Sequence, residues 1–99
     1  MDINMLREDK KLTVELVGRL DTLTSPSVEK ELAPALEGVD ELVFDLKGLE
    51  YLSSSGIRVL LAAQKAMEAS HGTMKMTGPN EHIMDVFEIT GLDSVFTFE

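Results

Sequence analysis

The chain has 99 residues and a mass of 10.9 kDa, the size of one domain with one modest hydrophobic core. Its formal charge of −9 disfavours contact with nucleic-acid phosphates and anionic lipid surfaces, and the absence of cysteine excludes disulfides, thiolate metal sites and cysteine nucleophiles. No apolar run approaches the roughly 18 residues of a membrane span, and the first residues lack the pattern of a signal peptide. We therefore expect a folded cytoplasmic protein that binds neither nucleic acid nor membrane.

The beginning of the chain predicts two strands joined by a turn. The apolar residues Leu12, Val14 and Leu16 recur at every second position, as in a strand with one buried face, and Ile3 and Met5 indicate a partner strand. The charged segment 7–11 between them is short enough to turn a hairpin, although it contains neither glycine nor asparagine.

A helix is predicted next, beginning at Ser25 and Pro26. Serine can cap free backbone N–H groups, and proline suits the first helical position because it needs no donor there. Apolar residues then recur at helical spacing as far as Gly38, which is typical of a helix end. Pro34 lies inside this segment, so we expect a kink or an irregular last turn beside it.

The remaining elements alternate between strand and helix. The near-continuous apolar run 42–46 predicts a central strand covered on both faces, as in a buried parallel sheet. The other predicted elements are a helix over 57–70, a strand around 74–76, a helix from 79–81 to Gly91, and a final strand over 95–98. This order favours one α/β domain over residues 1–99, with a mixed, mostly parallel sheet of four to five strands and helices packed against it.

The sequence offers little that is typical of an enzyme. The serines lack the G-x-S-x-G context of a hydrolase, and the glycine patterns of phosphate-binding loops and dinucleotide folds are absent. His71 and His82 fall at the ends of separate predicted helices, where exposed histidines are common, so we expect no metal site. Chance carboxylate pairs are abundant among 18 acidic residues, so none is assigned a catalytic role. We expect no catalysis and no cofactor.

A run of three serines followed by Gly56 stands out, because it lies where a buried strand passes into a helix. Serine at such a junction often only caps the helix, and this is the commoner explanation. The carboxyl ends of parallel strands beside helix N-termini are also where anions and ligands gather. A phosphate added there brings about −1.5 to −2 charges, which suits a binding switch. Both interpretations stay open from the residues alone.

Three stretches give the chain a resemblance to the STAS domain family, and within it to the anti-sigma factor antagonists of bacterial partner-switching systems. They are residues 18–22, 45–61 and 87–93, and the resemblance spans the whole chain. It implies a regulatory binding protein that, when unmodified, binds an anti-sigma factor serine kinase and releases the sigma factor to RNA polymerase. The kinase then inactivates its antagonist by phosphorylation, and a serine phosphatase acts on the phosphorylated form.

The resemblance also implies roles for individual residues. The phosphate acceptor of the family falls on Ser54, although the neighbouring serines leave the assignment open by one residue. Ser53 replaces an aspartate found in some relatives. The residues expected to contact the partner are Asp21, Thr22, Ser53, Ser55, Gly56 and Arg58.

Two other functions stay open. The same fold serves cytoplasmic adaptor subunits of transporters or of lipid-handling ATPase complexes, which have no phosphorylation switch. A small enzyme or ligand carrier that uses the sheet edge has the least support. The oligomeric state that we expect is a monomer or a weak dimer.

Overall fold

Two antiparallel strands open the fold in the computed structural model, which describes residues 1–99. Strand β1 (Asp2–Glu8) pairs with β2 (Lys11–Leu20) from Asp2 opposite Val17 to Glu8 opposite Lys11. Asp9 takes a left-handed conformation with φ 58°, which aspartate tolerates better than most residues. The predicted charged hairpin is confirmed.

The rest of the chain alternates between helices and strands. In order, its elements are α1 (Ser25–Ala35), β3 (Glu41–Asp45), β4 (Leu49–Leu52), α2 (Ser54–Ala69), β5 (Thr73–Thr77), α3 (Glu81–Ile89) and a 3₁₀ turn (Leu92–Ser94). The sheet order is β1-β2-β3-β5, and β4 pairs with the last residues of β2, beyond the end of β3. All pairs except β1–β2 are parallel. The predicted α/β class with a mixed sheet is confirmed.

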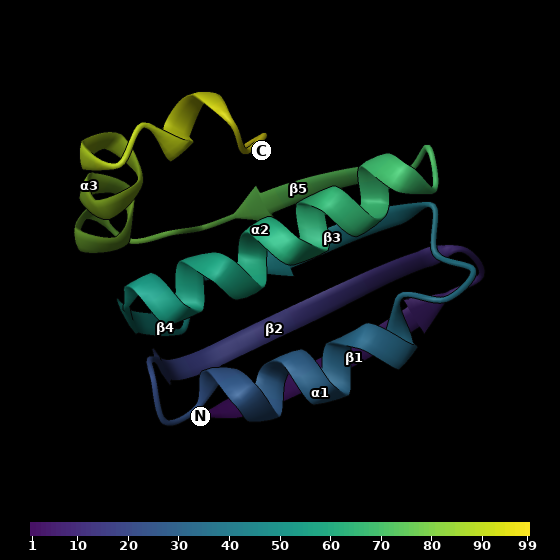
Figure 1. Ribbon diagram of the computed structural model, residues 1–99, viewed down its shortest axis with the longest axis horizontal. Helices are drawn as coiled ribbons and strands as arrows, with labels where there is room; N and C mark the ends of the chain where they lie inside the picture. The colour runs from purple at the N-terminus through teal and green to yellow at the C-terminus, as the bar shows by residue number, and fades with distance from the viewer.

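Helices α1 and α2 lie side by side over one face of the sheet (Figure 1). The strand residues that point to this face are buried: Leu12, Val14 and Leu16 of β2, Leu42 and Phe44 of β3, and Met74 and Met76 of β5. They belong to a core of 21 buried apolar residues. On the opposite face, Val43 is buried but its neighbours in register, Thr13 and Lys75, are partly exposed. Strand β3 itself is therefore buried on both faces, as predicted, although the second face of the sheet is less completely covered beside it.

The start of α1 corrects one prediction. The residue at the N-cap is Thr24, and no side chain caps the helix. Ser25 is already helical, and its hydroxyl donates instead to the carbonyl of Asp21. Pro26 lies in the first turn as predicted, and the helix ends at Ala35, one residue after Pro34.

Two further differences concern strands. Strand β4 was not predicted, because four residues, two of them buried, leave little periodic signal. The predicted final strand over 95–98 is reduced to one bridge, in which Phe98 pairs with Met76. Phe96 and Phe98 instead pack around Phe87 of α3, with ring centroids 5.5 and 5.6 Å from it. Aromatic packing therefore holds this end of the chain in place of a strand ladder.

Because β2 to β5 are parallel, their carboxyl ends meet at one edge of the molecule. The ends of β2 and β4 lie together there, and the loops that follow them lead into α1 and α2 (Figure 1). None of the helices is both long and apolar enough to span a lipid bilayer.

Candidate functional site

The three serines occupy the junction between β4 and α2. Ser53 is the N-cap residue of α2, and its hydroxyl oxygen accepts a hydrogen bond from the Gly56 N–H at 3.3 Å. The Ser53 N–H donates to the carbonyl of Leu20 at 3.0 Å, which ties the junction to the end of β2. A serine therefore caps α2, as one of the two interpretations of the sequence predicted.

Ser54 is the first residue of α2 and is exposed to solvent. Its hydroxyl takes part in none of the side-chain hydrogen bonds within the chain, whereas both neighbouring serines use theirs. The first turn of α2 contains no acidic residue. A free hydroxyl thus sits at the positive end of a 16-residue helix, where negative charge is favoured.

Ser55 links the serine junction to the loop after β2. Its hydroxyl lies 3.4 Å from that of Thr22. These two residues and Arg58 line a shallow cavity of about 260 Å³ between the first turns of α1 and α2, together with Ser25, Pro26, Glu29 and Val59. The structure thus brings together three of the residues that were predicted to contact a partner.

Gly56 lets α2 begin close against the sheet. It is buried, and a Cβ atom built on it would lie 2.7 Å from the carbonyl oxygen of Leu20 and 2.8 Å from a methyl carbon of Leu52. Both distances are shorter than a Cβ atom tolerates. The glycine therefore sets the position of the serines through packing, and its burial keeps it from direct contact with a partner.

Asp21 organises the loop between β2 and α1. One carboxylate oxygen accepts hydrogen bonds from the N–H groups of Leu23 at 3.0 Å and Thr24 at 3.1 Å, and the other lies 3.7 Å from Nε of Arg19. These contacts lower the pKa of Asp21 below its usual value, chiefly through the Thr24 N–H, with partial opposition from desolvation. Asp21 is thus an ionised residue that shapes the loop, and Thr22 is an exposed polar residue that the loop presents.

Three residues beside the site were not singled out from the sequence. The guanidinium carbon of Arg19 lies 4.1 Å from the ring centroid of Tyr51, which places a cation over an aromatic face. Tyr51 was missed because β4 was missed. Leu23 is 88% exposed at the tip of the Asp21 loop, and no sequence pattern distinguishes it from a core leucine.

Comparison with known proteins agrees with this arrangement. The family model described as "Mlab, STAS domain" matches residues 3–97. BtrV of Bordetella bronchiseptica, whose name places it among the anti-sigma factor antagonists, is 33% identical over 97 residues, which cover 97% of this chain and 84% of that protein. The anti-sigma-B factor antagonist of Bacillus subtilis is 24% identical over 95 residues, covering 96% of this chain and 87% of the relative.

Solved structures show the same fold. Unphosphorylated SpoIIAA, an anti-sigma factor antagonist, superimposes with a TM-score of 0.86 at 19% identity, covering 99% of this chain and 88% of that one. Phosphorylated SpoIIAA of Bacillus gives a TM-score of 0.78 at 19% identity, with 99% of this chain and 91% of the other covered. The sheet, the capped serine junction and these matches lead to one assignment. The chain belongs to the STAS domain family.

Proposed function

We propose that this chain is an anti-sigma factor antagonist whose binding is controlled by phosphorylation of Ser54. The observation that carries the proposal is the division of roles at the junction: Ser53 caps α2, so the exposed hydroxyl of Ser54 is not needed for that purpose. The curated relatives that match most of the chain are named as antagonists of anti-sigma factors. A free hydroxyl at a helix start, with no structural duty, suits a modification site.

In its unmodified form the chain binds an anti-sigma factor with serine kinase activity, and the sigma factor is released. The contact surface consists of the exposed Ser54 and the predicted partner residues around it that are not buried: Asp21, Thr22, Ser53, Ser55 and Arg58. Thr22 and Arg58 offer side chains, Gly56 sets the position of the serines through packing, and Asp21 holds the loop in shape. This binding takes place in the cytoplasm, with the chain as a monomer or weak dimer.

The chemical step belongs to the partner. The hydroxyl oxygen of Ser54 attacks the γ-phosphorus of ATP held by the kinase, the bond from that phosphorus to the β–γ bridging oxygen breaks, and ADP leaves. The hydroxyl proton passes to a base of the kinase. This chain supplies the acceptor and its position and contributes no catalytic group. A serine phosphatase later hydrolyses the phosphoserine and restores the binding form.

The phosphate changes the surface in two ways. It adds about −1.5 to −2 charges and three acceptor oxygens at a position that is exposed in the free chain. A kinase surface shaped to receive a small neutral hydroxyl then meets both bulk and charge. The phosphorylated chain releases the kinase, which is again free to bind its sigma factor.

The test is phosphate transfer by a candidate anti-sigma factor serine kinase from the same organism. Wild type, Ser54→Ala, Ser53→Ala and Ser55→Ala are incubated with the kinase and Mg-ATP, and intact mass reports the phosphate added. We expect one phosphate on wild type and on both control variants, and none on Ser54→Ala. Equal transfer to Ser54→Ala would remove Ser54 as the acceptor.

The adaptor function predicts a different result in phosphate transfer and in copurification. The matching family model carries the description "Mlab, STAS domain", which keeps this alternative under test. An adaptor subunit would copurify stoichiometrically with a transporter or ATPase subunit, and it would acquire no phosphate from any serine kinase of its host. That pair of results would replace the antagonist proposal.

A further inference from the structure

Arg58 is a cation without a partner beside the proposed phosphate acceptor. It is exposed and takes part in none of the ion pairs of the chain, which join Lys11 to Glu41, Arg19 to Asp21 and Lys75 to Glu99. No side chain or carbonyl accepts a hydrogen bond from it. Its guanidinium group is therefore available in the unmodified chain.

The helix places Arg58 on the same side as Ser54. The two residues are four positions apart in α2, the spacing at which side chains of successive turns meet. Long helical side chains tend to lean back toward the preceding turn, so a phosphate on Ser54 would come within reach of the flexible, exposed Arg58 side chain, which lines the cavity with Thr22 and Ser55 in the unmodified chain. A planar guanidinium can donate two parallel hydrogen bonds to phosphate oxygens. The spacing and the two chemistries are thus compatible.

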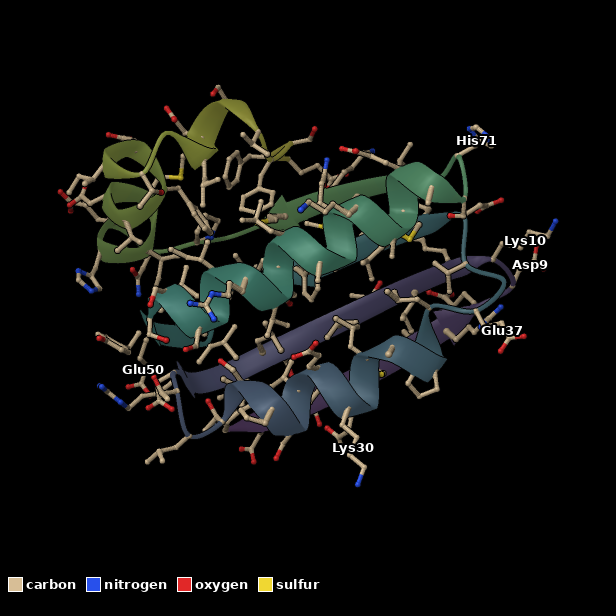
Figure 2. All side chains as sticks on the ribbon, viewed as in Figure 1. Asp9, Lys10, Lys30, Glu37, Glu50 and His71 are labelled. Carbon is tan, nitrogen blue, oxygen red and sulfur yellow. The ribbon has the colours of Figure 1, made fainter.

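Competing charges around this position are few. On α1, Glu29 lines the same cavity as Arg58 but forms no ion pair with it. In the loop after β2, the Asp21 carboxylate is bound by backbone N–H groups and lies 3.7 Å from Arg19, whose guanidinium rests over Tyr51. On β4, Glu50 lies at the same end of the molecule (Figure 2). A dianionic phosphate would outcompete these single carboxylates for Arg58.

We propose that Arg58 binds the phosphate of phosphorylated Ser54 within the same chain. This rests on the proposed function only in taking Ser54 as the acceptor. Phosphorylation then acts twice on the contact surface: it places negative charge at residue 54, and it withdraws the free cation at residue 58 from the partner. A partner carboxylate that pairs with Arg58 in the complex loses its counterion when the phosphate arrives.

The test uses phosphoserine installed at position 54 by genetic-code expansion, so that no kinase is needed. A ³¹P NMR titration measures the second ionisation of the phosphate, whose pKa is ordinarily about 6. Arg58→Gln is compared with Lys65→Gln, which removes the same charge from an exposed position of α2 about 16 Å along the helix from residue 54. Arg58→Lys tests whether charge alone restores the effect.

We expect the phosphoserine pKa to be about 0.2–0.4 unit higher in Arg58→Gln than in wild type, unchanged in Lys65→Gln, and partly restored in Arg58→Lys. Phosphorylation should also raise the thermal midpoint more in wild type than in Arg58→Gln. Equal phosphoserine pKa values in Arg58→Gln and Lys65→Gln would overturn the inference. If the kinase phosphorylates Ser54 but the two pKa values are equal, only the inference about Arg58 fails. If the pKa differs but no kinase phosphorylates Ser54, only the proposed function fails.

Discussion

Helices α2 and α3 begin at the same edge of the sheet with the same kind of cap, yet they differ in charge and in how firmly they are tied to the sheet. Ser53 caps α2 and Asn80 caps α3, each by accepting a hydrogen bond from the N–H three residues later. The first turn of α3 carries Glu81, whereas that of α2 carries no acid. Asn80 also donates to the carbonyl of Leu49, which fixes α3 to β4.

The difference makes the start of α2, and not that of α3, the better candidate for modification. In α3 the Asn80 side chain caps the Ile83 N–H, the carboxylate of Glu81 suits the positive end of the helix dipole, and the hydrogen bond to Leu49 ties the helix start to β4. In α2 the Ser53 side chain caps the Gly56 N–H. No acidic side chain meets the positive end of the helix dipole, where the free hydroxyl of Ser54 lies. A phosphate on Ser54 would supply the missing negative charge.

Replacing Gly56 should produce one of the two largest losses of stability. Gly56→Ala adds about 1 kcal/mol of helix propensity, but its Cβ would lie 2.7 Å from the Leu20 carbonyl, which is backbone and cannot yield cheaply. We expect a net loss of about 1–2 kcal/mol in the free energy of unfolding, measured by urea denaturation. A gain in stability would show that α2 does not need its close approach to β2.

Removing each helix cap should lower the free energy of unfolding by a different amount. Asn80→Ala loses the cap of α3 and the hydrogen bond to Leu49, and we expect it to cost about 1–2 kcal/mol. Ser53→Ala loses a single hydrogen bond of 3.3 Å, so we expect about 0.5–1 kcal/mol. Urea denaturation of both variants measures the difference. An equal or larger loss in Ser53→Ala would contradict the view that α3 has the more strongly anchored start.

Acid should weaken the loop beside α2 through Asp21. Because the folded-state pKa of Asp21 is lowered from 3.8, its contribution to stability is fully present above pH 3.8 and is lost as pH falls through the lowered value. Asp21→Asn should be less stable than wild type at pH 7, and the gap in thermal midpoint should close below pH 3.8. Titration of the other acidic residues is common to both chains and cancels. A gap that stays constant down to pH 2 would contradict the role of the ionised carboxylate.

Much of the fold follows from the sequence because apolar periodicity is a local property. The hairpin and the three helices were predicted because residues such as Leu12, Val14 and Leu16 repeat at the spacing of their element. Strand β4 was missed and the last strand was predicted too long. Whether a short segment forms a strand depends on which other strand it pairs with, and local periodicity does not show that. Leu49–Leu52 becomes a strand by pairing with the end of β2, and Phe98 finds only Met76.

The position of the candidate site could be predicted from the sequence, but the separate roles of its residues could not. The serines and Gly56 identify a junction between strand and helix, and the family resemblance directs attention to Ser54. Sequence does not show which serine caps the helix, because the choice depends on backbone angles at Ser53. It also does not show that Thr22, Ser55 and Arg58 line one cavity, because they come from a loop and a helix that meet only in the folded chain.

The most direct test compares the affinity of the serine kinase for two forms of this chain, one unmodified and one with phosphoserine at position 54. Isothermal titration calorimetry gives both dissociation constants with the same kinase preparation. The account predicts that the phosphorylated form binds at least about tenfold more weakly, because charge and bulk replace a small hydroxyl at an exposed helix start. Equal affinity of the two forms would contradict it.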